Sequence, residues 1–278
     1  MSSAGATPAG TVAAALAAIL LVAPIAARHG SAQQLEKVSV RGKPQILRLY
    51  GQESGPPVVV SSGDGGWIHL APEVAEWLAA RGHFVVGVDS KAYLAGFTSG
   101  THTLTTTDVR ADYRVFLDAA RRGRDSPTLL VGVSLGAGLS VLAASNADLH
   151  PLLAGVVALG LPDENELGWR FRDSIIYLTK KTPNEPVFHA ADVISAVSPI
   201  PLAGIHSVHD EFAPASDARR LFALPGAPKR LWVVEARNHR FSGNPEGFRC
   251  ALSEALAWIA AQSPGGPGSG PALPSVAR

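Results

Sequence analysis

The chain has 278 residues, a length that a single α/β domain can fill without dividing. Its 24 Lys and Arg residues nearly balance its 23 Asp and Glu residues, so no broad basic surface favours binding to nucleic acid. Cys250 is the single cysteine, which excludes an intramolecular disulfide framework and a cysteine-rich metal site.

The first feature along the chain is an apolar run over residues 11–27, followed by the small residues Gly30, Ser31 and Ala32. The run is shorter than the roughly 18 to 20 residues that span a bilayer, which favours a cleaved signal peptide. No Lys or Arg precedes it, so a retained N-terminal anchor is the alternative. We therefore expect residues 1–32 to direct export, with the domain periplasmic or secreted.

Short apolar or β-branched runs then alternate with amphipathic stretches up to residue 262, the pattern of a parallel sheet covered by helices. Runs with apolar residues at consecutive positions predict strands that are buried on both faces. These predicted strands are Val58–Ser61, Phe84–Val88, Leu129–Val133, Gly155–Leu159, Leu202–Val208 and Leu231–Glu235. Two weaker runs, Glu36–Val40 and Gln45–Tyr50, predict an antiparallel pair at the sheet edge.

Amphipathic stretches that end near Gly, Asn or polar clusters predict the helices. They are His69–Ala80, Thr107–Arg121, Leu135–Ala147, Ala215–Leu224 and Glu246–Ala261. The last helix is expected to bury Cys250 as a structural thiol. Residues 163–197 interrupt the alternation and predict an insert or lid over the carboxyl edge of the sheet. The domain is thus predicted over residues 33–262, followed by a disordered tail rich in Gly, Pro and Ser over residues 263–278.

The pentapeptide Gly132-Val133-Ser134-Leu135-Gly136 follows a predicted strand and opens a predicted helix. In that setting G-x-S-x-G forms the nucleophile elbow of α/β hydrolases. The serine sits in a strained turn, and the residues two positions away must lack bulk. The sequence therefore predicts an α/β-hydrolase fold, with a mostly parallel sheet and helices on both faces, and Ser134 as nucleophile. A glycine-rich turn without catalysis is the alternative.

A serine hydroxyl needs a base to take its proton, and in hydrolases that base follows later in the chain. His239 comes after the last strong strand and before the final helix, where this fold presents its histidine. It is the predicted base, with His209 as the leading alternative.

The acid that orients the histidine is predicted just beyond a buried strand. Asp210 ends the run from Leu202, and Glu211 is adjacent to it. Asp163, after the preceding strand, is the second choice, and an ordinary solvated aspartate remains open for Asp210.

Acyl chemistry also needs backbone N–H groups aimed at the developing oxyanion. Leu135, directly after the serine, is expected to supply one of them. The second is expected from Asp64 or Gly65 in the loop Ser62–Trp67, which follows an early strand as the oxyanion loop of esterases does. That loop lacks the Lys-Ser or Lys-Thr ending of a phosphate-binding loop.

Three motifs together carry a family resemblance: Ser-Gly-Asp-Gly-Gly-Trp at 62–67, Gly-Val-Asp-Ser at 87–90 and the elbow at 132–136. From Val58 to Ala260 the chain resembles the AcvB/VirJ family of bacterial virulence proteins. The resemblance implies an exported α/β-hydrolase domain that hydrolyses the aminoacyl ester of lysyl-phosphatidylglycerol, and an association with type IV secretion. It also implies Ser134 as nucleophile, His239 as base and Asp210 as acid.

The chain departs from the family in two places. Val133 stands where the family is expected to have Tyr, and Asn238-His239-Arg240-Phe241 replaces a family pattern of Gly-His-His-Phe. These departures affect the expected substrate more than the expected catalysis.

Substrate contacts are predicted in two regions. The stretch Trp169–Lys181 mixes aromatic with basic side chains and could form a lid that meets a phosphate and an acyl chain together, or could simply pack on the domain. Asp64 and Asp89 are candidate partners for a substrate ammonium, and Trp67 is a further substrate-binding candidate.

The predicted function is therefore ester hydrolysis through an acyl-enzyme on Ser134, with an aminoacylated phospholipid as substrate and a membrane surface as possible partner. No cofactor or metal is required, and nothing indicates an oligomeric state. A general carboxylesterase or thioesterase, or a non-catalytic partner in type IV secretion, are the alternatives.

Overall fold

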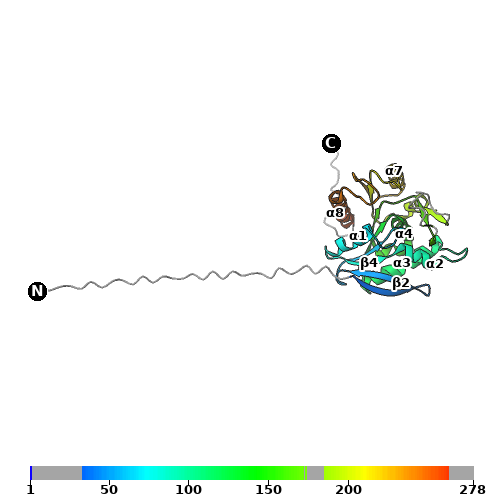
Figure 1. The fold of residues 1–278 in the computed structure, drawn as a ribbon, viewed down its shortest axis with the longest axis horizontal. Helices are drawn as coiled ribbons and strands as arrows, with labels where there is room; N and C mark the ends of the chain where they lie inside the picture. The colour runs from blue at the N-terminus through cyan, green and yellow to red at the C-terminus, as the bar shows by residue number, and fades with distance from the viewer. Residues whose placement is uncertain (2–32, 172, 174–184, 263–278) are drawn as a thin grey trace, which may run out of the picture.

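The computed structural model describes residue 1 and residues 33–171, 173 and 185–262 (Figure 1). The predicted export segment at 1–32 and the predicted tail at 263–278 lie outside the described residues, apart from Met1. The same holds for most of the predicted lid stretch, since residues 172 and 174–184 are not described.

An eight-stranded sheet forms the centre of the domain, in the order β1-β2-β4-β3-β5-β6-β9-β10. Only the pairs β1–β2 and β2–β4 are antiparallel, so the predicted edge pair and the mostly parallel sheet are confirmed. The strands are β1 (Gln34–Val40), β2 (Lys43–Tyr50), β3 (Pro57–Ser61), β4 (Phe84–Val88), β5 (Thr128–Val133), β6 (Leu153–Leu159), β9 (Leu202–Ser207) and β10 (Lys229–Val234).

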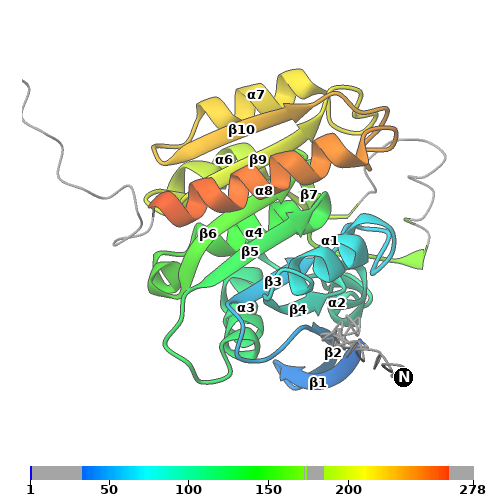
Figure 2. The ribbon, with the colours of Figure 1, turned by 90° about the vertical axis from the view of Figure 1, so that its left-hand side faces the viewer.

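Helices cover both faces of this sheet (Figure 2). The α-helices are α1 (Leu70–Ala79), α2 (Ser90–Phe97), α3 (Thr106–Arg121), α4 (Leu135–Ala144), α6 (Ala190–Val193), α7 (Ala215–Ala223) and α8 (Pro245–Gln262). Short 3₁₀ turns are η1 (Ala147–Leu152) and η3 (Ile194–Val197). Five of these helices were predicted within a few residues of their ends, whereas α2 and α6 were not predicted.

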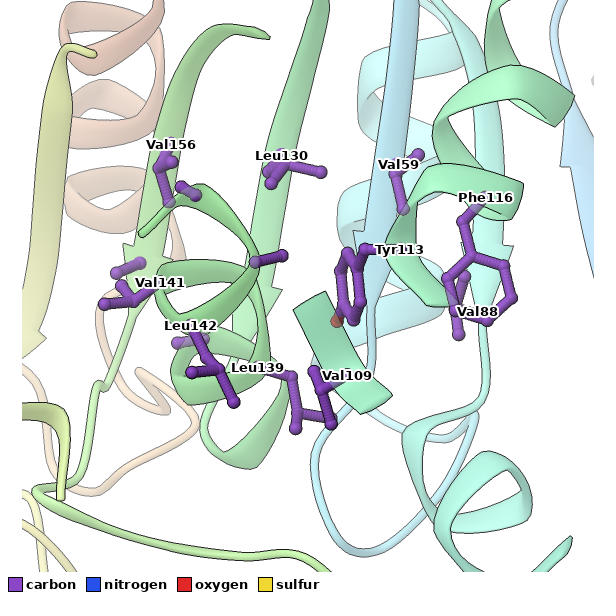
Figure 3. Packing of buried hydrophobic residues seen from close by; sticks show 14 of the residues in the cluster. Val59, Val88, Val109, Tyr113, Phe116, Leu130, Leu139, Val141, Leu142 and Val156 are labelled. Carbon is purple, nitrogen blue, oxygen red and sulfur yellow. The ribbon is translucent and has the colours of Figure 1, made fainter. Parts of the chain in front are cut away.

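Side chains that alternate along the central strands pack into two separate hydrophobic cores, one on each face of the sheet. Val59 and Leu130 pack with Tyr113 of α3 and Leu139 of α4 on one face (Figure 3). The neighbouring residues of the same strands, such as Val58 and Val131, pack on the other face with α1 and α8. Consecutive apolar residues in a strand are needed because both faces are buried, as the sequence predicted.

The insert predicted at 163–197 contains a small hairpin, in which β7 (Glu164–Glu166) pairs antiparallel with β8 (Val187–His189). Asp163 fixes its base, because one carboxylate oxygen accepts the Ala191 N–H at 2.9 Å and the other meets Arg220 at 3.1 Å. The hairpin follows β6 directly and so lies beyond the carboxyl edge of the sheet.

The prediction that α8 buries Cys250 is wrong. Cys250 is exposed, and its thiol lies 3.5 Å from the carboxylate of Glu254. The buried stripe of α8 runs instead through Phe248, Ala251, Leu252, Ala255 and Ile259. In residues 33–171, 173 and 185–262, no helix is both long and apolar enough to cross a membrane.

Candidate active site

Three residues that the sequence singled out follow the carboxyl ends of parallel strands. Ser134 follows β5, Asp210 lies three residues beyond β9, and His239 lies five residues beyond β10. Because these strands are parallel, their carboxyl ends share one edge of the sheet. The topology therefore brings the three loops to one side of the molecule.

Ser134 occupies the sharp turn between β5 and α4, with φ 54° and ψ −121°. A non-glycine residue with positive φ is strained, and such strain persists where the surrounding structure enforces it. Glycines on both sides make the turn possible. A Cβ on Gly132 would overlap the backbone of Gly136, and a Cβ on Gly136 would overlap the carbonyl oxygen of Ser61.

Gly136→Ala is therefore expected to lower the free energy of unfolding by about 2 kcal/mol or more, because backbone atoms must move to admit the methyl group. Gly96→Ala is the matched control. Gly96 lies in α2 and faces only the flexible amide of Gln45 at 3.2 Å, so this change should be neutral or stabilising. Chemical denaturation of both variants measures the difference, and equal stabilities would contradict the argument.

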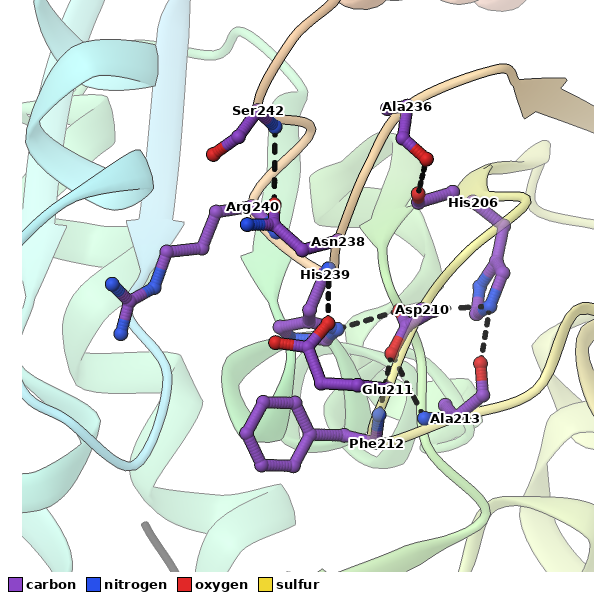
Figure 4. Close-up of polar contacts among 11 residues, drawn as sticks. His206, Asp210, Glu211, Phe212, Ala213, Ala236, Asn238, His239, Arg240 and Ser242 are labelled. Carbon is purple, nitrogen blue, oxygen red and sulfur yellow. Dashed lines mark hydrogen bonds and ion pairs between the residues drawn. The ribbon is translucent and has the colours of Figure 1, made fainter.

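His239 and Asp210 form a buried pair (Figure 4). The imidazole Nδ1 lies 2.6 Å from Asp210 Oδ2, and since a carboxylate only accepts, Nδ1–H donates. In the neutral imidazole this leaves Nε2 unprotonated. Nε2 is buried and has no hydrogen-bond partner among the described residues. The pair thus presents a free basic nitrogen, as a general base requires.

Neighbouring groups hold the Asp210 carboxylate in its charged form. Its Oδ1 accepts the backbone N–H groups of Phe212 at 3.0 Å and Ala213 at 2.9 Å. Burial alone would raise the pKa of Asp210, but the hydrogen bond and charge of His239, together with these two amides, outweigh burial and hold the pKa below its usual value. His206 of β9 lies 3.6 Å from the same carboxylate.

The imidazole lies beside the turn that carries Ser134. The backbone N–H of Ser134 donates to the carbonyl of Leu159 at 2.8 Å, and Gly160 follows directly. A Cβ on Gly160 would lie 2.6 Å from His239 Cε1, so the ring packs against the backbone beside Ser134. Ser134 and His239 line one cavity of about 160 Å³. Because Nε2 has no partner, no hydrogen bond joins the two residues in this structure.

The alternative residues lie elsewhere. His209 is exposed and its Nε2 pairs with Glu235 at 3.0 Å, away from the buried pair. Asp163 anchors the insert, as described above, rather than the imidazole. Glu211, the neighbour of Asp210, accepts the backbone N–H of His239 at 2.8 Å and so holds the loop that carries the imidazole.

The predicted oxyanion residues gather around Ser134. Leu135, Asp64 and Gly65 line the same cavity, together with Gly63. A Cβ on Gly63 would lie 3.4 Å from Ser134 Cβ, so this loop passes directly beside Ser134. As the first residue of α4, Leu135 has an N–H without a partner inside the helix. The geometry is therefore suited to stabilising negative charge on a substrate oxygen.

Trp67 and Asp89, predicted to contact substrate, do not line this cavity. The Trp67 indole N–H donates to Tyr50 at 3.0 Å, and its ring fills the space above Gly87. Asp89 caps α2 by accepting the Ala92 N–H and pairs with Arg48 at 3.3 Å. Both side chains have partners in the protein outside this cavity, and their contact with substrate stays a prediction.

Sequence reasoning missed two carboxylates of the cavity, Glu164 and Glu166 of β7. Burial, with the charges of Asp64, Asp173 and Glu164 adding to it, raises the pKa of Glu166 to about 7. Burial also raises the pKa of Asp64, although the charges of His239 and Lys91 oppose it. No sequence motif marks Glu166, because only the folded hairpin brings it beside the loop of Asp64.

The raised pKa of Glu166 predicts a pH-dependent stability. Between the unfolded value near 4.5 and the folded value of about 7, the folded state keeps a proton that the unfolded state loses. The free energy of unfolding therefore falls as pH rises through this window. Glu166→Gln should remove the effect, making the variant about 1 to 3 kcal/mol more stable than the parent at pH 8 and no different at pH 4. Chemical denaturation of the parent and the variant at pH 4 and pH 8 checks this. A difference in stability between the two proteins that is the same at both pH values would refute it.

Part of the chain is similar to a known protein family. Residues 57–154 match the family of the bacterial virulence protein VirJ. The matched segment contains all three motifs on which the resemblance rests, at 62–67, 87–90 and 132–136, so the resemblance to the VirJ family is confirmed over that segment. Comparison with curated proteins gives no match.

Solved structures show the same fold at low sequence identity. The α/β hydrolase GrgF from a Penicillium species is 14% identical with a TM-score of 0.60, over 83% of this chain and 98% of its own. The Pyrococcus furiosus esterase Pf2001 is 14% identical, with a TM-score of 0.60 over 81% and 90%. Naproxen esterase from Bacillus subtilis is 13% identical, with a TM-score of 0.60 over 81% and 92%. The predicted α/β-hydrolase fold is confirmed.

Proposed function

We propose that this chain is a serine ester hydrolase that cleaves the aminoacyl ester of lysyl-phosphatidylglycerol through an acyl-enzyme on Ser134. The observation that carries the proposal is the buried His239–Asp210 pair, in which His239 has a free Nε2 and lines the same cavity as Ser134. The fold that the chain shares with two esterases supports the same reaction class, and the VirJ match supports the family resemblance that implies the substrate.

Acylation begins when Nε2 of His239 takes the Ser134 proton and the Ser134 oxygen attacks the ester carbonyl. The carbonyl oxygen becomes an oxyanion, which accepts hydrogen bonds from the N–H of Leu135 and from the loop amide of Asp64 or Gly65. When the tetrahedral intermediate collapses, the ester bond breaks and His239 gives its proton to the leaving alcohol oxygen. Asp210 stabilises the imidazolium while it exists.

Deacylation repeats these steps with water as nucleophile. His239 takes a proton from the water, and the resulting hydroxide attacks the acyl carbon on Ser134. Collapse of the second intermediate breaks the bond to the Ser134 oxygen, which recovers its proton from His239. The products are the free acid, lysine for the proposed substrate, and phosphatidylglycerol.

A second cavity gives space for the large leaving group. It has a volume of about 740 Å³ and lies between α1 and α8. His69, Leu70 and Arg240 line both this cavity and the one that holds Ser134, so the two adjoin. Arg240 would meet a phosphate that passes between them. The position of this cation supports a phosphoglycerol leaving group.

Substrate comparison tests the proposal. The purified domain should release lysine from lysyl-phosphatidylglycerol in mixed micelles with a higher kcat/KM than it shows toward short-chain aryl esters. Equal or better activity on the aryl esters or on thioesters would favour a general carboxylesterase or thioesterase. A domain that neither hydrolyses any of these nor reacts with a fluorophosphonate probe would be a non-catalytic partner.

Export is part of the proposal, because the apolar run at 11–27 is typical of an export segment. Fractionation of cells that express the full chain should place it in the periplasm or the medium. N-terminal sequencing of that material would separate a cleaved segment from a retained anchor. Recovery in the cytoplasm alone would refute export without affecting the proposed reaction.

A further inference from the structure

We infer that Glu166 and Asp64 form a cation subsite beside Ser134, which selects esters whose acyl part carries an ammonium group. This inference rests on the proposed function and specifies its substrate. Glu166 belongs to the insert and Asp64 to the Gly-rich loop, and both line the cavity that contains the nucleophile. The subsite would therefore contact the acyl group of the ester, which is the part that becomes bonded to Ser134.

The packing of Asn165 directs Glu166 into the cavity. Asn165 is fully buried against α4, where a Cβ on Gly138 would overlap its side chain. Its amide also donates to the carbonyls of Pro162 and Asp163, both at 3.1 Å. Side chains of a strand alternate between its two sides, so the neighbours Glu164 and Glu166 face away from α4. Both line the cavity, in agreement with this register.

Negative charge gathers around Glu166. The side chain is nine-tenths buried, and the charges of Asp64, Asp173 and Glu164 all disfavour its ionised form. Burying carboxylates close together is costly, and a nearby cation lowers that cost. A substrate ammonium that enters the cavity would be attracted to Glu166 and Asp64, and this attraction would offset the cost of removing the ammonium from water.

A second observation points to a ligand in this cavity. His239 also lines it and is nine-tenths buried, and its Nε2 has no partner in the described part of the chain. A buried acceptor of this kind is normally satisfied, and in the proposed reaction it takes the Ser134 proton when an ester is bound. The carboxylates therefore lie in the same cavity as the groups that act on the ester.

A matched pair of aryl esters tests the subsite: the ester of lysine and the ester of hexanoic acid, which share a six-carbon chain and differ in their ammonium groups. The ratio of kcat/KM for lysine ester to that for hexanoate is measured for the parent and for Glu166→Gln. We expect the parent to favour the lysine ester, and the variant to lower the ratio by about tenfold or more, mainly through KM. The two esters also differ in intrinsic reactivity, but this difference affects the ratio equally in both proteins and so cancels when the two ratios are compared.

Glu53→Gln is the control, since Glu53 is exposed and pairs with Arg122 at 3.2 Å, outside both cavities. It removes the same charge and should leave the ratio unchanged. An unchanged ratio in Glu166→Gln, or an equal fall in the control, would overturn the inference.

A binding measurement tests the subsite independently of the reaction. Lysinamide is titrated by calorimetry into Ser134→Ala and into the same variant with Glu166→Gln, neither of which needs turnover. Binding that weakens about tenfold with the second change supports the subsite, and equal binding overturns it. If the parent hydrolyses no ester, the proposed function fails, and this titration still decides the subsite.

Discussion

Ser134→Ala should lower kcat for ester hydrolysis by a factor on the order of 10⁴ to 10⁶, the largest effect expected of any single change in this chain. The reason is chemical, because Ala offers no oxygen to attack the ester carbonyl, while the cavity and the oxyanion donors remain. The strained turn is retained, since Ala can occupy the same backbone conformation as Ser134 with no added bulk. Folding should therefore change little.

Steady-state kinetics with a soluble aryl ester and labelling by a fluorophosphonate probe measure the loss. Ser145→Ala is a suitable control, because Ser145 follows the same helix and its hydroxyl donates to the carbonyl of Leu142, remote from the cavity. The control should be labelled normally. Labelling or hydrolysis that survives in Ser134→Ala would mean that another group is the nucleophile.

Asp210→Asn is the second change with a large expected effect, a fall in kcat on the order of 10³ to 10⁴. The Asn carbonyl oxygen can still accept the amides of Phe212 and Ala213, so the loop keeps its shape. The Asn NH₂ group, however, cannot accept from His239 Nδ1. The ring then favours the tautomer with the proton on Nε2, which can no longer take the Ser134 proton.

A double-mutant cycle distinguishes this mechanism from general damage. Because Asp210 acts only through the imidazole, Asp210→Asn should cost almost nothing further once His239→Ala is present. His209→Ala is the control, since His209 is exposed and pairs with Glu235. Additive losses in the cycle, or a comparable loss in the control, would contradict the proposed roles.

Much of this architecture could be predicted from the sequence because its causes are local. Runs such as Val58–Ser61 are apolar at every position, and only a strand covered on both faces needs that pattern. The glycines at 132 and 136 are required by backbone contacts around one turn, so the elbow is visible in five consecutive residues. The place of His239 followed from fold topology, which orders the loops along one sheet edge.

Predictions failed where the outcome depends on contacts between distant segments. The sequence also does not show that Arg48 and Tyr50 of β2 would pair with Asp89 and Trp67, which stand in two separate motifs. Cys250 is exposed because the buried stripe of α8 passes one residue away from it. Neither the partner strand nor the rotation of a helix can be read from the local sequence.

Glu166 shows why the proposed acyl-binding part of the site is hard to predict. Its position depends on Asn165, which seats against Gly138, the glycine two residues beyond the elbow motif. Gly138 thus has a different role from Gly136: it admits the side chain that orients the insert, whereas Gly136 admits the backbone of Ser61. The helix that begins at the nucleophile therefore also sets the direction of the carboxylates opposite it. The proposed catalysis and the proposed selection of a cationic acyl group would then depend on two glycines of one helix, Gly136 and Gly138.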